Sequence, residues 1–552
     1  MSERRRPIEN SAVIPTHSVV TRPAELALVR LCVELGASAF GGALSPAERE
    51  LIEQARLPMT SEPEVDSVRA AIMGGDDPLG TALCRIRPPH ERRTRGAFYT
   101  PPEIVDSMLD WVLAQQPDRL VDPGCGSGRF SVGAVRRRQD LAIIAIDVDP
   151  LATLITRANL AVTGAHSATV LNADYTSFDL PIIRGRTAFV ANPPYVRHHG
   201  LDAEAKNRAV AMGRRLGYAV STLAGLHVHF FLATAIHAQP GDVGCFVTSA
   251  EWLDVNYGAV VRDLLVNGLG GESLHVVDAR TAPFEDAMTT AAVVCFRVGA
   301  KANTMSLRLV GSPAELGNLR LGREVQRRVL AREPRWTPLV RADQERTDVG
   351  RVPLRAVARV HRGVVTGAND FFILTRQRAQ ALGIEEWCRP VIASAEEILQ
   401  SGGVVRNGPE RRLLLDVPAS VDRAAYPDLD SYLRRGEEAL GEGTPIAQRY
   451  VPSHRNPWWQ LGTPPPPIVA SYMARQAPFF ALNPDGLAII NIAHGIYPRQ
   501  ELTATQLAAL VAALNEARDS YRGSGRTYHG GLEKFEPREM EALLVPPIGV
   551  LL

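Results

Sequence analysis

The feature that most constrains the fold is an alternation of short apolar runs and helical segments between about residues 96 and 300. Six runs have the length and composition of buried strands: RLVDPG, AIIAIDVDP, ATVLNAD, TAFVANPPY, VGCFVTSA and SLHVVDA. Segments with helical spacing lie between several of them, for example at 150–161 and 227–238. Strands that alternate with helices are typical of a mainly parallel, doubly wound α/β sheet. We therefore expect one such domain over residues 91–300.

The flanking segments have a different character. Residues 1–90 contain short helical patterns broken at Gly-Gly and Asp-Asp-Pro, which predicts a helical N-terminal extension. Residues 301–345 are rich in arginine and polar residues, and we expect them to form a connector. Residues 346–552 mix Gly, Pro and Trp clusters such as NPWWQLGTPPPP with one clear helix at 504–518, which indicates a second domain.

The bulk composition excludes several classes of protein. A chain of 552 residues is too long for one hydrophobic core and predicts two or three domains. The six cysteines are scattered without a C-x-x-C pair, which argues against a zinc ribbon and a disulfide framework and fits a reducing cytoplasm. No apolar run approaches the roughly 18 residues that span a membrane. We expect a soluble, cytoplasmic protein with no membrane partner and no metal.

A glycine-rich turn follows the first predicted strand, which ends at Asp122. Gly124, Gly126 and Gly128 have the spacing G-x-G-x-G, which differs from the G-x-G-x-x-G of dinucleotide enzymes. Glycines at such a turn let the backbone bend tightly against a ligand. We interpret this turn as the beginning of a site for a nucleoside cofactor.

Two further strands also end in carboxylates. Asp147 ends the second strand, where a carboxylate can accept hydrogen bonds from both hydroxyls of a ribose. The third strand ends in NADY, where Asp174 could receive an adenine amino group and Tyr175 could pack on the adenine ring. Three successive strands ending in aspartate indicate a binding site for S-adenosylmethionine.

The fourth strand ends in Asn192-Pro193-Pro194-Tyr195. A proline-rich turn is the purely structural alternative, but each residue also suits transfer of a methyl group to an exocyclic amine. The Asn192 side-chain carbonyl and the Pro193 backbone carbonyl can each accept one N–H, which lets the amine lone pair localise toward the donor. The prolines hold the loop extended, and Tyr195 offers a face on which a base can stack. No Pro-Cys dipeptide follows a strand in this region, so covalent attack on cytosine C5 is not supported.

These motifs occur in a characteristic order, with RGAFYTPPEIVDSML before the glycine turn and AIDVDP, NADY and NPPY after it. In this order the chain resembles the gamma-type adenine-N6 DNA methyltransferases of restriction–modification systems, over about residues 95–297. The resemblance implies a Rossmann-like class I methyltransferase domain that uses S-adenosylmethionine. It also implies that Tyr99, Thr100 and Pro101 line the methionine part of the cofactor.

The resemblance assigns two phenylalanines as well. Phe284, in APFEDAMTTAAVVCF, matches a position that stacks on the flipped base opposite Tyr195, although ordinary core packing is the alternative. Phe231, in HFFLATAI, is placed near the cofactor adenine.

The C-terminal half carries looser similarities. HRGVVTGANDFFIL and GGLEKFEP resemble segments of TaqI-like target-recognition domains, which implies an α+β domain that finds the DNA target. The implied partners are double-stranded DNA, bound by a monomer, and a separate cognate restriction endonuclease in a bacterial cytoplasm.

Three other functions stay open at this stage. A glutamine methyltransferase acting on release factors shares the NPPY motif, but such enzymes are shorter and lack the C-terminal segments. A bifunctional restriction–methylation enzyme would need a nuclease motif, and the first lysine, Lys206, stands in Glu204-Ala205-Lys206 within the methyltransferase region, where we expect a helix or an insertion. A DNA-binding subunit without catalysis is the third.

Overall fold

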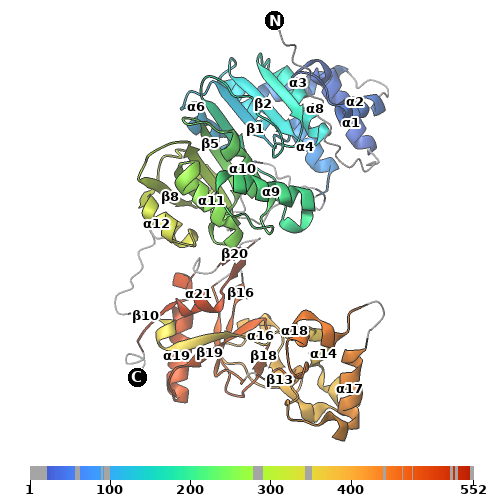
Figure 1. The fold of residues 1–552 in the computed structure, drawn as a ribbon, viewed down its shortest axis with the longest axis vertical. Helices are drawn as coiled ribbons and strands as arrows, with labels where there is room; N and C mark the ends of the chain where they lie inside the picture. Colours follow the sequence, from blue (N-terminus) through green and yellow to red (C-terminus); the bar gives the residue numbers. More distant parts are fainter. Residues whose placement is uncertain are drawn as a thin grey trace.

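The described part of the chain forms an N-terminal half and a C-terminal half, which Figure 1 shows as two adjoining lobes. The computed structural model describes residues 22–55, 62–88, 91, 100–277, 290–341, 351–438, 443–462, 464–474, 477–521, 526–528 and 532–547. The two halves have separate apolar cores.

A nine-stranded sheet in the order β3-β2-β1-β4-β5-β7-β6-β8-β9 organises the N-terminal half. Strands β3, β2, β1, β4 and β5 are parallel neighbours, whereas β7 runs antiparallel between β5 and β6. The strand order reverses between β1 and β4, the place where open α/β sheets bind ligands. The strands are β1 (Arg119–Pro123), β2 (Ala142–Asp147), β3 (Ala168–Asn172), β4 (Thr187–Ala191), β5 (Val243–Ser249), β6 (Gly271–Val277), β7 (Ala291–Arg297), β8 (Thr304–Val310) and β9 (Arg323–Gln326). All six predicted strands are confirmed.

Alternate residues of each strand enter two apolar cores on opposite faces of the sheet. Val121 and Phe189 pack on the face covered by α10, while Leu120 and Ala188 pack on the face covered by α6. Burial on both faces explains why these strands read as continuous apolar runs. The helices of this half are α6 (Pro102–Leu113), α7 (Arg129–Arg137), α8 (Pro150–Val162), α9 (Ala203–Leu216), α10 (Leu226–His237), α11 (Ala259–Asp263), α12 (Arg327–Arg332) and α13 (Thr337–Val340). The tripeptide around Lys206 lies in α9, as expected.

The N-terminal extension is helical, as expected, and packs against α8 (Figure 1). Its helices are α1 (Pro23–Glu34), α2 (Pro46–Gln54), α3 (Glu62–Gly74) and α4 (Pro78–Ile86). Leu28 and Val29 of α1 share one apolar cluster with Leu154 and Ile155 of α8. The extension therefore shares a core with the sheet domain instead of forming a domain of its own.

The prediction that residues 301–345 form a connector is wrong for most of this segment. Strand β8 pairs with β6, and β9 pairs with β8, so both extend the large sheet. Met305 and Leu307 of β8 and Val325 of β9 are buried in its core. The composition obscures these two strands, because polar and charged residues such as Ser306, Arg308 and Glu324 alternate with their apolar positions.

The C-terminal half mixes small sheets and helices, as an α+β domain does. Its two four-stranded sheets have the orders β11-β19-β15-β17 and β12-β14-β13-β18. The strands are β10 (Val352–Pro353), β11 (Ala358–Arg362), β12 (Ile373–Leu374), β13 (Cys388–Ile392), β14 (Leu413–Leu415), β15 (Ile468–Ser471), β16 (Met473–Ala474), β17 (Phe480–Leu482), β18 (Ala488–Ile489), β19 (Ala493–Pro498), β20 (Arg526–Tyr528), β21 (Leu532–Lys534) and β22 (Leu544–Val545). The helices are α14 (Asn369–Phe372), α15 (Arg376–Ala381), α16 (Ala395–Leu399), α17 (Pro427–Glu437), α18 (Tyr450–Ser453), α19 (Ala504–Glu516), α20 (Arg518–Tyr521) and α21 (Pro537–Glu541).

The two halves are in contact with each other. Strand β20 lies against the short 3-10 helix at Ala250–Leu253 (Figure 1). The Arg335 guanidinium lies 3.7 Å from Asp254 of the N-terminal half and 3.6 Å from Glu539 of the C-terminal half. Within the described ranges, no helix has the length and apolar character needed to cross a membrane.

Candidate active site

A cavity of about 600 Å³ opens at the carboxyl ends of β1, β2, β3 and β4. The predicted residues that line it are Thr100, Gly124, Gly126, Asp147, Asp174, Tyr175, Asn192 and Pro194. The fold thus brings the glycine turn, two strand-end aspartates and the NPPY motif to one place. No cluster of three metal-ligating side chains is present among the described residues.

The three glycines of the turn have the backbone conformation that favours glycine. Their φ values are +72° at Gly124, +56° at Gly126 and +82° at Gly128. A Cβ at Gly128 would also lie 2.9 Å from Thr156 Cγ2, so the turn is packed against α8. Gly126 N donates a 2.9 Å hydrogen bond to Asp147 Oδ2, which joins the turn to the next strand end.

Asp122 does not line the cavity. Its carboxylate is buried and accepts hydrogen bonds from Ser131 N at 3.1 Å and Ser131 Oγ at 2.7 Å. Burial raises the pKa of Asp122 to about 7, and the two Ser131 bonds oppose that rise. Asp122 therefore joins the end of β1 to the start of α7. These two elements flank the glycine turn, so the hydrogen bonds help to fix its position.

Asp147 lines the cavity and is held by backbone donors. In addition to Gly126 N, the backbone N–H of Asp149 donates to Asp147 Oδ1 at 2.9 Å. Burial and the nearby Asp149 charge raise the pKa of Asp147 to about 6. The carboxylate is thus fixed in place by two bonds at the position where a ribose is expected.

Asp174 and Tyr175 differ in how they meet the cavity. Asp174 Oδ2 forms a 3.0 Å ion pair with Arg208 of α9, while Oδ1 accepts from Thr176. Tyr175 is only 2% exposed, and its hydroxyl lies 2.8 Å from Thr234 Oγ1. Its ring packs 5.4 Å from that of Phe230, so Phe230 stands beside Tyr175 at the cavity wall.

The NPPY motif leaves β4 with Asn192 and Pro194 facing the cavity. Asn192 Nδ2 donates a 3.0 Å hydrogen bond to Thr100 Oγ1, which orients the side-chain carbonyl oxygen away from Thr100. Pro193 is buried, and Tyr195 is partly buried against the core that α6 also enters, so its ring keeps some exposed surface; neither residue lines the cavity. Burial raises the pKa of the Tyr195 hydroxyl well above its usual range.

The motif before the glycine turn is described only in part. Thr100 lines the cavity, and its backbone carbonyl accepts a 2.6 Å hydrogen bond from Arg129. Pro101 is the N-cap residue of α6 and does not line the cavity. Tyr99 and Phe284 lie outside the described residues, so their predicted roles stay predictions.

The placement of Phe231 near the cofactor is wrong. Its ring is fully buried, 5.1 Å from that of Phe246 and 6.2 Å from that of Trp252. The preceding residue, Phe230, lines the cavity instead. Adjacent helix positions point about 100° apart, so a shift by one residue changes the environment completely.

Several lining residues were missed by sequence reasoning. Gly80, Leu83 and Cys84 come from α4 of the N-terminal extension, Arg87 is the C-cap residue of that helix, and Arg208 comes from α9. The sequence does signal the start of α4, since Asp77 precedes Pro78 in the pattern of an N-cap followed by proline. Nothing in the sequence indicates that this helix meets the carboxyl ends of the strands.

A second, more open cavity of about 560 Å³ lies on the C-terminal half. It is lined by Arg359, His361, Pro464, Tyr497, Pro498 and Arg499. Arg359 and His361 project from the outer side of β11, because the alternate residues Ala358 and Val360 are buried in the core. None of these described lining residues is a carboxylate, so the surface combines cationic and aromatic groups.

Comparisons with known proteins show to which families the chain is similar. Residues 87–252 match the N-6 DNA Methylase family model, and residues 340–550 match the model of the C-terminal domain of type II methyltransferase M.Eco57I. Type II methyltransferase M.XamI of Xanthomonas campestris pv. amaranthicola is 39% identical over 541 residues, 95% of this chain and 98% of that protein. Type II methyltransferase M.AccI of Acinetobacter calcoaceticus is 25% identical over 83% of this chain and 87% of that protein. Among solved structures, the type IIG restriction endonuclease BpuSI matches with a TM-score of 0.46 and 15% identity, over 95% of this chain and 70% of that chain.

The family follows from the extent of the similarity. The Xanthomonas relative matches both halves of the chain, including the N-terminal extension, and the N-6 DNA Methylase model spans the glycine turn and the NPPY motif. The Rossmann-like α/β fold and the predicted family are both confirmed. The chain belongs to the type II DNA methyltransferases of restriction–modification systems.

Proposed function

We propose that this methyltransferase transfers a methyl group from S-adenosylmethionine to the N6 amino group of an adenine flipped out of double-stranded DNA. The observation that carries the proposal is the Asn192–Thr100 hydrogen bond at the wall of the cavity that also contains Asp147. An amide oriented by a fixed partner can accept an N–H from an exocyclic amine, and the same cavity can hold a nucleoside cofactor.

The cavity suits S-adenosylmethionine in three respects. The glycine turn leaves open space at Gly126, where a Cβ would meet no atom within 4 Å. Asp147 is held as an acceptor for ribose hydroxyls, and Phe230 and Val148 offer apolar surface to an adenine ring. The bound cofactor would supply an electrophilic methyl group on its sulfonium centre.

The residues of the chain supply orientation and electrostatic stabilisation. The Asn192 carbonyl oxygen and the Pro193 backbone carbonyl each accept one N–H of the target amine, so that the amine lone pair points at the methyl group. As positive charge develops on the amine nitrogen, these two dipoles stabilise it. Tyr195 and Phe284 are the proposed stacking partners of the flipped base, which offset part of the cost of unstacking.

DNA binding is assigned to the C-terminal half. The second cavity there presents Arg359 and Arg499 with the rings of His361 and Tyr497, which lie 5.5 Å apart. Guanidinium groups bind phosphates, and aromatic rings stack on bases or sugars. We assign this surface to the DNA backbone, with one protein monomer on each duplex, and a separate cognate endonuclease as the second component of the system.

The test is methylation of DNA by the purified protein with S-adenosylmethionine carrying a labelled methyl group. Mass spectrometry of the digested nucleosides should find label in N6-methyladenine; label in N4-methylcytosine would overturn the choice of base. Label on glutamine of added release factors, and none on DNA, would favour the protein methyltransferase alternative. Asn192→Ala should lower kcat by about 10²–10³-fold, the cost of removing one such acceptor or donor, while S-adenosylhomocysteine still binds.

A further inference from the structure

Helix α4, part of the N-terminal extension, runs along the cofactor cavity. Gly80, Leu83, Cys84 and Arg87 all line that cavity, so one side of the helix faces it along its length. Leu83 and Cys84 are half-buried. A helix of nine residues is about 13 Å long, which is comparable with the length of an extended nucleoside bearing an amino-acid side chain.

The first turn of α4 is attached to the glycine turn. Asp77 caps the helix by accepting from Gly80 N at 2.8 Å. Its other oxygen accepts from Ser127 Oγ at 2.5 Å and from Arg129 Nε at 3.1 Å. The approach is close, since a Cβ at Gly80 would lie 2.7 Å from Ser127 Oγ. The beginning of α4 is therefore held against the loop that is expected to meet the cofactor.

The end of α4 is attached to the turn that carries Asp147. Arg87 Nε donates to Glu25 of α1 at 2.8 Å, and its terminal nitrogens form an ion pair with Asp149. Asp149 in turn caps α8 through Leu151 N at 3.0 Å and donates its own N–H to Asp147. Arg87 thus contacts the residue that orients the proposed ribose acceptor.

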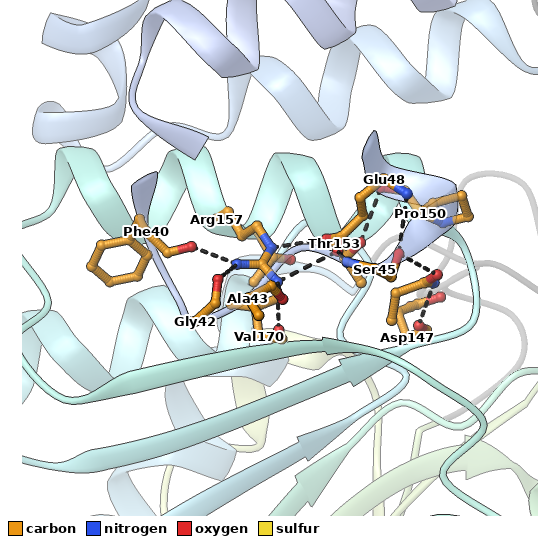
Figure 2. Close-up of polar contacts among 12 residues, drawn as sticks. Phe40, Gly42, Ala43, Ser45, Glu48, Asp147, Pro150, Thr153, Arg157 and Val170 are labelled. Carbon is orange, nitrogen blue, oxygen red and sulfur yellow. Dashed lines mark hydrogen bonds and ion pairs between the residues drawn. The ribbon is translucent and has the colours of Figure 1, made fainter. Parts of the chain in front are cut away.

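The extension that carries α4 is anchored by a buried network, drawn in Figure 2. The fully buried Arg157 guanidinium donates to Glu48 Oε1 at 2.8 Å and to the backbone carbonyls of Phe40, Gly42, Ala43 and Val170. These acceptors use all five N–H groups of an arginine. Because α2 and the segment before it are fixed in this way, the extension is in a defined position relative to the sheet.

A polar chain leads from this network to the cofactor site. Ser45, the N-cap of α2, has its Oγ 3.1 Å from Asn172 Oδ1. Asn172 Nδ2 donates to the Asp147 backbone carbonyl at 3.1 Å. Figure 2 labels Ser45 and Asp147, the two ends of this polar chain.

We propose that α4 is a fixed wall of the cofactor site, in which Leu83 and Cys84 contact the adenosine part of S-adenosylmethionine and Arg87 positions the Asp147–Asp149 turn. Cys84 lies one helical turn before Arg87, which places it toward the nucleoside end of the cavity. Val148, between the two aspartates, is 58% exposed and also lines the cavity, so it offers a further apolar side chain to the adenosine. This inference rests on the proposed cofactor.

Cysteine modification in the presence of S-adenosylhomocysteine tests the contact. The full-length protein is treated with N-ethylmaleimide, and the modification of Cys84 and Cys388 is followed by mass spectrometry. Both thiols are half-buried, but Cys388 lies in the C-terminal half and serves as an internal control. At a concentration of about ten times Kd, S-adenosylhomocysteine should slow modification of Cys84 by about tenfold through mass action and leave Cys388 unchanged. Equal rates at Cys84 with and without bound ligand would overturn the proposal.

Paired substitutions on the two sides of α4 give a second readout. Leu83→Trp should weaken S-adenosylhomocysteine binding by about tenfold or more, whereas Thr81→Trp on the exposed side should stay within about twofold. Arg87→Ala should also weaken S-adenosylhomocysteine binding, and Arg85→Ala, at an exposed position, is its control. Melting temperatures show whether each variant folds.

The outcomes separate this inference from the proposed function. If the wild-type protein does not bind S-adenosylhomocysteine, the proposed cofactor is wrong. If it binds, but the Leu83→Trp variant binds S-adenosylhomocysteine as tightly as the Thr81→Trp variant does, the proposal that α4 is a wall of the cofactor site is wrong. The cofactor assignment then stands. If Cys84 is not modified even in the free protein, the affinity of the Leu83→Trp variant for S-adenosylhomocysteine decides whether α4 contacts the cofactor.

Discussion

Phe230 and Phe231 are adjacent in α10 and lie in opposite environments. The Phe230 ring faces the cofactor cavity beside Gly124, where an added Cβ would lie 3.5 Å from the ring, whereas Phe231 packs between Phe246 and Trp252. The same substitution at the two positions should therefore separate ligand binding from stability.

Phe231→Ala should lower the free energy of unfolding by about 3–5 kcal/mol, as expected for a large buried aromatic side chain, with little change in cofactor affinity. Phe230→Ala should weaken S-adenosylhomocysteine binding by about tenfold or more, with a smaller loss of stability, because its ring is buried but borders the cavity on one side. Urea denaturation and calorimetric titration measure the two quantities. The assignment fails if the two variants exchange these effects.

The Arg157–Glu48 pair should be one of the costliest contacts to break. Both side chains are fully buried, so Arg157→Ala leaves the Glu48 charge without its guanidinium and should cost about 3–5 kcal/mol. Arg137 is the control, because its pairs with Asp106 and Asp110 are exposed and Arg137→Ala should cost no more than about 1 kcal/mol. Equal midpoints of urea denaturation for the two variants would contradict the buried network.

Cofactor affinity should depend on the ionisation of Asp147. Burial raises the pKa of its carboxyl from 3.8 to about 6. Ribose hydroxyls donate to the ionised form, so affinity should fall as pH drops below about 6, by up to about tenfold per pH unit. Titration with S-adenosylhomocysteine between pH 5 and 8 checks this, and Asp147→Asn should bind weakly with a flat profile.

The ionisation of Asp147 should also affect the stability of the free protein, but in the opposite direction: its contribution to stability should fall as pH rises, whereas cofactor affinity should increase. A folded-state pKa above the unfolded value means that the folded protein binds the extra proton, so this contribution to stability is complete below about pH 4 and is lost as pH rises through about 6. The difference in unfolding free energy between the wild type and Asp147→Asn should therefore change in favour of the variant as pH rises. A constant difference from pH 4 to 8 would show that Asp147 keeps its ordinary pKa.

The basic cavity of the C-terminal half should contribute to DNA affinity through phosphates. Arg359→Ala and Arg499→Ala should each weaken binding to cognate and unrelated duplexes alike, and should reduce the slope of log K against log salt concentration by about one. Arg434→Ala on the exposed side of α17 is a control, because its guanidinium pairs with Asp430. Fluorescence anisotropy at several salt concentrations measures both effects. A loss confined to one DNA sequence would indicate a base contact instead.

The parts of the site that could be predicted from sequence are those that follow a strand directly. Asp147, Asp174 and Asn192 each stand at or just after the end of a parallel strand, and such ends meet at one edge of the sheet whatever the rest of the chain does. The glycine turn is equally local, since its positive φ values require that residue type. Short-range rules therefore predict these side chains together.

The parts that were missed depend on contacts far apart in sequence. Every residue from His227 to Thr234 in α10 is buried, so the helix has no polar side and its periodicity cannot choose between Phe230 and Phe231. Arg87 reaches the site only because Glu25 and Asp149 hold it, and these residues are 62 positions away on either side. Strand β8 becomes part of the sheet only through pairing with β6, and β9 only through pairing with β8, which their composition does not indicate.

The segment around Gly41 covers one edge of the large sheet, which matters for any truncation that removes the N-terminal extension. Strand β3 is at the edge of the large sheet, and the outward backbone groups of Val170 are both satisfied from outside the sheet: its N–H donates to Gly41 O at 2.8 Å and its carbonyl accepts from Arg157. An unprotected edge strand is a template for pairing with another chain. Removal of the extension would therefore uncover a self-associating edge, and a shortened enzyme should aggregate even where its catalytic residues are intact.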